Sequence, residues 1–403
     1  MAWTVRLLTV NSLAEAEREL AAIHVDPFNI RNMAPKMVHH LLLLEGLNAS
    51  EGNLVKQEML SLGGDAAISG CTMEGDSPGT VILMGTEKQL RRVCARLTEH
   101  PFGYPSLAAD IKRLLDIDAN TPHKWDIGKR TLDLSSRACI MGVLNVTPDS
   151  FSDGNRFFTI EKAVERACEM EEEGADIIDI GGESTRPFAR PVDEAEELKR
   201  VIPVIEKLSG RLKIPISIDT YKSAVAEKAL AAGAEIVNDI SALLFDERMA
   251  EVVAAASAGL VLMHTKARPS VMQKETEYGA IISDIIAVLQ QSVAMAEAAA
   301  VSRERIVIDP GIGFGKNVAG NMEILRRLAE FKAIGCPILV GTSRKSFIGQ
   351  ILKRDTGERI FGTAATMAIA LVNGASIFRV HDVKEMRDVL DMSLALCRPM
   401  TSP

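Results

Sequence analysis

The sequence predicts an α/β protein in which a (β/α)8 barrel follows a small N-terminal α+β or α/β domain. Three observations support this organisation. The chain has 403 residues, which is more than one average domain and suits one large barrel with a small partner. After about residue 123, eight apolar, β-branched runs alternate with amphipathic helical stretches, whereas the first part of the chain lacks this regularity. We therefore expect two domains, at residues 1–120 and 123–403.

Short apolar runs and helical patterns make up the first domain. Trp3–Val10 predicts a strand, and Leu13–Ile23 predicts a helix that begins with a capping box of Ser12 and Glu15. The other features are an apolar run at Val38–Leu44, a strand at Val81–Met84, and helices at Gly52–Leu62, Glu87–Leu97 and Leu107–Leu115. Asp118–Pro122 is the expected linker to the second domain.

Eight buried strands are expected in the second domain, at Cys139–Val146, Asp176–Ile180, Ile214–Ile218, Glu235–Val237, Gly259–Met263, Arg305–Ile308, Pro337–Val340 and Ser376–Val380. Helices between them include Ile160–Glu173, Glu194–Leu208, Lys222–Ala232 and Ile281–Ala300. Eight regular units favour a TIM barrel over a doubly wound open sheet, the competing fold. Thr131–Ser135 predicts an extra strand in a hairpin that closes the bottom of the barrel.

Composition excludes several classes of function. The formal net charge of -8 argues against a protein that binds nucleic acid or an anionic membrane. The six cysteines are scattered without a CxxC pair, which suits reduced thiols and offers no zinc site. The N-terminus lacks the apolar core of a signal peptide, and no stretch reaches the roughly 18 apolar residues of a membrane span. We expect a soluble, cytoplasmic protein.

Polar residues follow the predicted strands, one group for each strand. They are Asn145, Asp179, Asp219, Asn238-Asp239, Met263-His264, Asp309, Ser343–Ser346 and Arg379–His381. In a barrel all these positions face one mouth, where this fold builds its active sites. Singly each has a simpler reading: an Asp after a strand is a helix N-cap about three times as often as a catalytic group, and His264, Met263 and Phe314 could be core residues. Together they predict an active site.

Here the sequence resembles the dihydropteroate synthase family. The residues that carry the resemblance are Met141–Gly154, Asp179–Pro187, Ser217–Thr220, Val237–Ile240, Asp309–Lys316, Ser343–Ser346 and Arg379–Val383. They occur in order and at suitable spacing over about residues 125–395, and residues 1–120 resemble no family that we recognise. The resemblance implies a folate-biosynthesis transferase (EC 2.5.1.15 type) and sulfonamide target that joins (7,8-dihydropterin-6-yl)methyl diphosphate to 4-aminobenzoate, giving 7,8-dihydropteroate and diphosphate.

The resemblance also implies three sub-sites, and the chemistry suits the residue types. Asp219, Asn238, Asp309 and Lys345 would bind the pterin edge, with Asp179 nearby and Met263 against the ring. Asn145 would bind Mg2+, while Arg379, His381 and, from mobile loops, Thr185 and Arg186 would act at the diphosphate. Phe314, Pro187 and Lys345 would line the 4-aminobenzoate ring, with Ser346 at its carboxylate. We expect Asp219, Lys345, Arg379, Thr185 and Arg186 to be the catalytic residues.

Two loops depart from the family pattern, and alternatives remain open. Thr265-Lys266-Ala267 stands where the family usually has Met-Gln-Gly, and Phe188 replaces a usual Gly. A methyltetrahydrofolate-dependent corrinoid methyltransferase would share the pterin site, but it would not need Arg379, His381 or Ser343–Ser346. A non-catalytic pterin-binding paralogue is the other alternative. A homodimer is expected, and the N-terminal domain is interpreted as a scaffold.

Overall fold

The computed structural model describes residues 3–69, 79–100, 104–120, 124–147, 156–184 and 191–397. The chain divides into two compact units, at residues 1–120 and 121–403, and each is considered by itself.

The N-terminal unit is an α+β fold, because its three strands are antiparallel. The sheet has the order β1-β3-β2, and Leu43 of β1 lies opposite Ile82 of β3. Its core contains Val55, Leu83 and Leu90, all fully buried. The strands are β1 (His39–Leu47), β2 (Asp65–Ile68) and β3 (Gly79–Thr86), and the helices are α1 (Leu13–Ala22), α2 (Pro27–Met37), α3 (Ala49–Ser61), α4 (Glu87–Glu99) and α5 (Pro105–Asn120).

The expectations for this unit are confirmed in part. Helix α1 begins as predicted, since the Ser12 hydroxyl accepts a hydrogen bond from the Glu15 backbone at 3.2 Å. The prediction of a strand at Trp3–Val10 is wrong, because this segment pairs with no strand among the described residues and Trp3 is 95% exposed. Apolar alternation alone did not make a strand there, because a strand also needs a partner. The first three residues of the expected linker, 118–120, belong to α5 instead, and its last two lie outside the described residues. Helix α2 and strand β2 were not predicted.

The second unit is the predicted TIM barrel. Eight parallel strands follow the order β11-β10-β9-β8-β7-β6-β13-β12, and a parallel bridge between Ile308 and Ile338 joins the two ends of this row. The strands are β6 (Cys139–Asn145), β7 (Ile177–Gly181), β8 (Ile216–Asp219), β9 (Ile236–Asp239), β10 (Gly259–Met263), β11 (Ile306–Asp309), β12 (Leu339–Val340) and β13 (Ile377–Val380). Each expected strand is present, with bounds that differ by at most two residues and coincide for β10.

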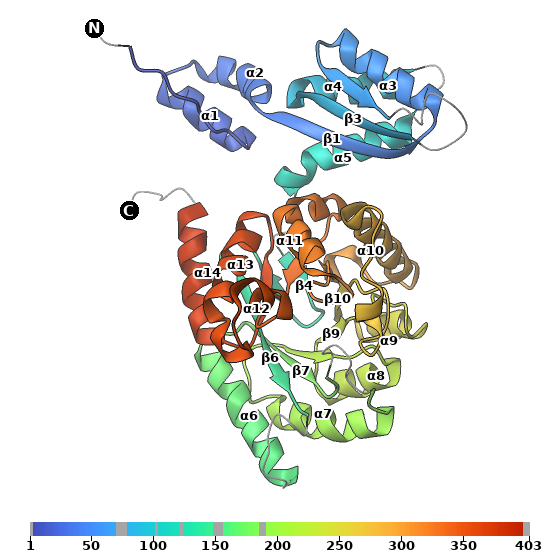
Figure 1. Ribbon diagram of the computed structural model, residues 1–403, viewed down its shortest axis with the longest axis vertical. Helices are drawn as coiled ribbons and strands as arrows, with labels where there is room; N and C mark the ends of the chain where they lie inside the picture. The colour runs from blue at the N-terminus through green and yellow to red at the C-terminus, as the bar shows by residue number, and fades with distance from the viewer. Residues whose placement is uncertain are drawn as a thin grey trace. The chain divides into compact units, whose positions relative to one another are not determined.

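Helices surround the strands (Figure 1). They are α6 (Arg156–Glu172), α7 (Glu194–Leu208), α8 (Ser223–Ala232), α9 (Met249–Ala256), α10 (Ile281–Ala298), α11 (Val318–Arg326), α12 (Ser346–Leu352), α13 (Ile360–Val372) and α14 (Val383–Cys397), with 3-10 turns at Met272–Lys274, Arg303–Arg305, Leu328–Ile334 and Thr356–Glu358. Their apolar sides and the outward side chains of the strands form one continuous core.

Helix α10 is long and apolar enough to cross a membrane, with a mean hydropathy of 1.3 over 18 residues. The expectation that no stretch would reach this length is therefore wrong. However, Ile285 and Leu289 of α10 are fully buried in the core around the barrel, and a core helix of a water-soluble protein has the same composition. The finding is weak evidence for a span.

The predicted hairpin closes the bottom of the barrel. It consists of β4 (Lys124–Asp126) and β5 (Thr131–Asp133), which pair antiparallel. Trp125 is fully buried among the inward side chains of the strands, and its indole nitrogen donates a hydrogen bond to the Arg305 carbonyl at 2.8 Å. This bond satisfies the one polar atom of an otherwise apolar plug.

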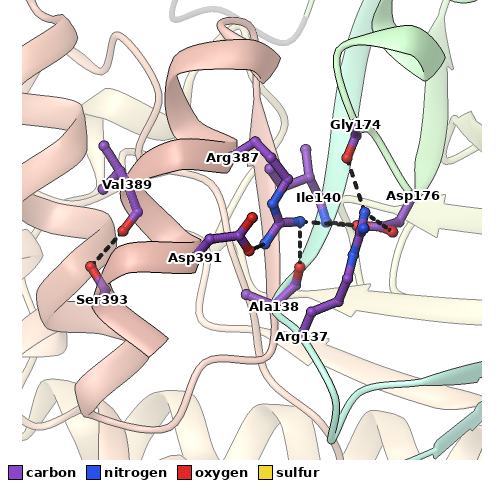
Figure 2. A network of polar contacts seen from close by, with 9 residues as sticks. All are labelled: Arg137, Ala138, Ile140, Gly174, Asp176, Arg387, Val389, Asp391 and Ser393. Carbon is purple, nitrogen blue, oxygen red and sulfur yellow. Dashed lines mark hydrogen bonds and ion pairs between the residues drawn. The ribbon is translucent and has the colours of Figure 1, made fainter. Parts of the chain in front are cut away.

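A polar network joins the first and last βα units of the barrel (Figure 2). Asp176, just before β7, accepts from the Ile140 backbone at 2.8 Å and from Arg137 at 2.5 Å. Arg387 of α14 lies 3.4 Å from the same carboxylate and donates to the Ala138 carbonyl at 2.8 Å. These contacts fix α14 against the start of β6, where the barrel closes.

Candidate active site

The carboxyl ends of the strands bring the predicted polar residues together. In the parallel register, Asp219 of β8 lies beside both Gly181 of β7 and Asn238 of β9. Met263 of β10 pairs with Asp309 of β11 in the same way. These side chains therefore lie at the same end of the barrel, as the alternation of strands and helices in the sequence predicted.

Arg379 is the centre of the polar cluster. From β13 it crosses the mouth and donates to Asp179 and to Asp219, each at 2.6 Å. Asn238 donates to the same oxygen of Asp179 at 3.0 Å. The two carboxylates are 0% and 5% exposed, so Arg379 pairs with two buried carboxylates at once.

The second oxygen of each carboxylate is available to a ligand. Oδ1 of Asp179 and Oδ1 of Asp219 are buried and have no hydrogen-bond partner among the described residues. Such groups are costly unless another molecule pairs with them. Burial raises the pKa of Asp219 to about 7, and the nearby Arg379 opposes that rise. The site therefore presents acceptors that match the adjacent N–H donors of a heterocyclic edge.

Asp309 and Lys345 form a second part of the site. Asp309 accepts from the Gly311 backbone at 2.7 Å, and burial raises its pKa to about 6. Burial and the neighbouring Arg379 lower the pKa of Lys345 to about 8. The Lys345 ammonium lies 4.0 Å from the centre of the Phe314 ring, which is within the range of a cation–π interaction.

An apolar wall adjoins these charges. Met263 and Phe314, which are 4% and 6% exposed, pack in one cluster with Tyr221, Ile240 and Met272. A planar ring bound by the carboxylates would lie next to these apolar side chains. The packing role considered for Met263 and Phe314 is therefore compatible with a binding role.

His381 and Ser343 lie on the rim. The Ser343 hydroxyl accepts from the His381 backbone at 3.2 Å and lies 3.0 Å from His381 Nδ1. The direction of this second hydrogen bond depends on the tautomer of the ring. Burial and Arg379 lower the pKa of His381 to about 3, so the ring offers a neutral N–H donor to an anion.

Asn145 ends β6, and its Oδ1 faces Gly181. A β-carbon at Gly181 would lie 3.7 Å from Asn145 Oδ1 and 3.6 Å from Asp219 Oδ2, so the missing side chain leaves space between these oxygens. No group of three or more His, Cys, Asp or Glu side chains that could hold a metal occurs in the described part of the chain. A metal here would take one amide oxygen from Asn145, which suits Mg2+ bound mainly through a substrate.

The remaining predicted site residues fall into two groups. Ser346 is exposed and begins the seven-residue helix α12, next to Lys345. Thr185, Arg186 and Pro187, together with the departure at Phe188, lie outside the described residues.

Two simpler readings hold for residues beside the site. The carboxylate of Asp239 binds the following turn, because it accepts hydrogen bonds from the backbone of Ser241 at 2.8 Å and of Leu243 at 2.7 Å. His264 is a buried, hydrogen-bonded histidine whose partner is Lys316.

The sequence did not single out two further clusters. One is the buried Lys316, which bonds to the loop that carries Phe314. The other joins Lys222 to Glu183 at 2.5 Å and also to Glu197, just before the segment with Thr185. The burial of these charged side chains identifies both clusters, and burial cannot be read from the sequence.

Comparison with known proteins agrees with this geometry. The family described as "Pterin binding enzyme" matches residues 141–381. A dihydropteroate synthase from Synechocystis sp. is 46% identical over 278 residues, which are 69% of this chain and 96% of that protein. The chain belongs to the dihydropteroate synthase family of pterin-binding enzymes.

Family resemblance extends to structure and to the N-terminal unit. The crystal structure of a Clostridium difficile dihydropteroate synthase, determined in the presence of pteroic acid, is 48% identical with a TM-score of 0.64, and the match covers 66% of this chain and all of that one. A probable bifunctional folylpolyglutamate synthase/dihydropteroate synthase of Halobacterium salinarum is 42% identical over 93% of this chain. The matched part is 45% of that protein, so this chain spans about half its length.

Proposed function

We propose that this chain is a dihydropteroate synthase. It joins (7,8-dihydropterin-6-yl)methyl diphosphate to 4-aminobenzoate and releases 7,8-dihydropteroate and diphosphate. The observation that carries the proposal is the constellation of Asp179, Asp219 and Asn238 around Arg379, facing Asp309 and Lys345 across one barrel mouth. The relative crystallised with pteroic acid, a molecule containing both halves of the product, supports the substrate class.

The pterin edge binds to the acceptors of the site. Asp219, Asn238 and Asp309 receive its N–H groups, Lys345 donates to its acceptors, and Met263 packs on the ring. The unpartnered oxygens of Asp179 and Asp219 support this assignment, because a pterin would supply the missing donors. A ring without matching donors would leave these oxygens unpaired, which gives specificity.

The diphosphate lies near Arg379 and His381. Nη1 of Arg379 forms no hydrogen bond with any described residue, and the neutral His381 ring contacts phosphate when its proton is on Nε2 and Ser343 donates to Nδ1. Thr185 and Arg186 act at the same group. Asn145 supplies one oxygen to Mg2+, which when bound neutralises charge on the diphosphate. Stabilising the leaving group favours breakage of the carbon–oxygen bond.

4-Aminobenzoate lies against Phe314, Lys345 and Pro187, with its carboxylate near Ser346. The aniline nitrogen forms a bond to the pterin methylene carbon as the bond from that carbon to the diphosphate oxygen breaks, and the nitrogen then loses a proton. The nucleophile is neutral near pH 7 and needs no strong base. The buried carboxylate of Asp219 stabilises positive charge that develops on the pterin.

The rival reaction is methyl transfer from methyltetrahydrofolate to a corrinoid. It would use the Asp219 and Asn238 edge but has no anionic leaving group for Arg379 and His381. The decisive assay supplies purified protein with dihydropterin diphosphate, 4-aminobenzoate and Mg2+ and measures diphosphate release. Release should require all three and should stop with a chelator and resume with added Mg2+. Turnover of methyltetrahydrofolate without diphosphate release would overturn the proposal.

Assembly and location complete the proposal. We infer a cytoplasmic homodimer in which exposed apolar side chains of α13 and α14, among them Phe361 (84% exposed), Val372 and Leu396, form the contact between copies. Sulfonamides, as analogues of 4-aminobenzoate, would inhibit it. The N-terminal unit acts as a scaffold. Sedimentation of the full chain tests the assembly, and a monomer at micromolar concentration would contradict it.

A further inference from the structure

The loop between Gly311 and Gly315, called the Phe314 loop below, follows β11 and carries Phe314 into the mouth. Gly311, Gly313 and Gly315 have φ angles of +70°, +84° and +60°. These conformations favour glycine, and they turn the backbone so that its carbonyls cannot pair in a regular helix or strand. The position of Phe314 therefore depends on side chains that bind this backbone.

Lys316 is the main such side chain. Lys316 is 3% exposed, and its side-chain nitrogen donates to the carbonyls of Gly311 and Phe314, both at 2.9 Å. It also lies 3.1 Å from Nδ1 of His264 and 3.4 Å from the His264 carbonyl. It forms no ion pair in the described part of the chain. Burial lowers the pKa of Lys316 to about 7, and the hydrogen bonds to the loop carbonyls offset part of the cost of burying this amino group.

Three further side chains bind the same loop. Gln273 donates to the Gly313 carbonyl at 3.0 Å, and Tyr278 donates to the Gly315 carbonyl at 3.2 Å. Asn321 accepts from the Gly313 backbone at 2.7 Å. The ammonium of Lys266, from the segment that departs from the family pattern, lies 3.7 Å from the centre of the Tyr278 ring. Lys266 therefore contacts Tyr278, one of the side chains that hold this loop.

The Phe314 loop also sets the position of Lys345. A β-carbon at Gly313 would lie 2.9 Å from Cδ of Lys345, so the two are in close contact. The Lys345 ammonium lies 4.0 Å from the centre of the Phe314 ring. A shift of the loop would therefore move both groups that would flank 4-aminobenzoate. The carboxylates of Asp179 and Asp219 bind Arg379 and Asn238 instead and do not depend on this loop.

We propose that Lys316 is a positioning residue for 4-aminobenzoate, acting with Gln273 and Tyr278 by fixing the backbone of the Phe314 loop. Lys316 touches neither substrate. The inference rests on the proposed synthase activity and adds residues that determine the affinity for the amine substrate.

The test compares steady-state kinetics of the full chain with those of Lys316→Met, which keeps an unbranched stem but removes the donor. We expect KM for 4-aminobenzoate to rise about tenfold or more, because small displacements of positioning groups have large effects. We expect kcat and the Kd of a pterin, measured by calorimetry, to change by clearly smaller factors than this KM. Asp309 and Lys345 of the pterin site contact the loop, but Asp179 and Asp219 are held by Arg379. Partial misfolding would lower the active fraction and hence kcat without changing KM, so this pattern separates the two explanations.

Gln273→Leu removes a donor at a less buried position and should raise the same KM to a smaller extent. This variant decides the matter if Lys316→Met does not fold. Lys274→Met is the matched control, because Lys274 is the exposed neighbour of Gln273 and should change nothing. An unchanged KM for 4-aminobenzoate in a folded Lys316→Met or Gln273→Leu protein would overturn the positioning role. Wild-type protein without diphosphate release would instead overturn the proposed function.

Discussion

Replacement of Asp309 by Asn should weaken ligand binding and stabilise the fold at the same time. The substitution keeps the shape of the side chain, and the amide oxygen can still accept the 2.7 Å bond from Gly311. It removes the negative charge and places an N–H group where a pterin donor would arrive. A mismatched buried pair costs about 1–3 kcal/mol, which is roughly a 5- to 150-fold loss of pterin affinity.

The stability gain follows from the raised pKa of Asp309. Burial raises this pKa from 3.8 to about 6, and each unit corresponds to about 1.4 kcal/mol, so ionised Asp309 lowers the free energy of unfolding by up to about 3 kcal/mol. The favourable contribution of the protonated form is complete below about pH 4 and is lost as pH rises through about 6. The Asn variant has no carboxylate to ionise and does not lose stability in this way. The difference in free energy of unfolding between the variant and the wild type should therefore grow from about pH 4 to about pH 6 and stay constant above that.

Calorimetric unfolding of both proteins at about pH 5 and about pH 7.5 measures this difference, and titration with a pterin measures the affinity. Asp388→Asn is the control, because Asp388 is an exposed aspartate of α14 and should affect neither property. An Asp309→Asn protein that binds pterin as the wild type does would remove Asp309 from the ring site. Equal stabilisation at both pH values would refute the argument from its pKa.

Three other outcomes are expected. Asp176→Ala removes the acceptor shared by Arg137, Arg387 and the Ile140 backbone. It should lower the free energy of unfolding by about 2–4 kcal/mol in urea titrations while KM values stay constant. An unchanged unfolding midpoint would contradict the role of this network in holding α14 against β6. Arg379→Met should lower kcat/KM by about a hundredfold or more, because a donor to the leaving group is lost, and activity within threefold of wild type would exclude it from that role. A chain of residues 123–403 that is folded by circular dichroism should retain turnover, and a folded but inactive one would mean that the N-terminal unit completes the site.

The strands of the barrel and the rim of its site could be predicted from the sequence. Buried parallel strands are continuous apolar runs, and the carboxyl ends of all of them meet at one mouth. Asp219, Asn238 and Asp309 could therefore be placed together before any coordinates were known. The same reasoning failed for Trp3–Val10, because an apolar alternation does not say whether a partner strand is present.

Contacts between distant side chains could not be predicted. Family resemblance assigned Arg379 to phosphate, but its hydrogen bonds in the structure go to Asp179 and Asp219, which precede it by 200 and 160 residues. Lys316 is adjacent to a glycine-rich segment, yet the sequence gives no sign that its partners are backbone carbonyls and His264. Such partners depend on how loops from different strands pack, and no local pattern encodes that packing.

The place of β6 in the barrel has a consequence for synthesis of the protein. Cys139 on β6 lies beside Ile377 on β13 in the sheet, so one edge of the first barrel strand stays unpaired until β13, more than 200 residues later in the sequence, has left the ribosome. Contacts so far apart in sequence make folding slow and leave an unpaired strand edge exposed meanwhile. A nascent chain that ends before β13 would keep this edge open, and such truncated products should therefore be substrates for chaperones or proteases rather than partly active enzymes.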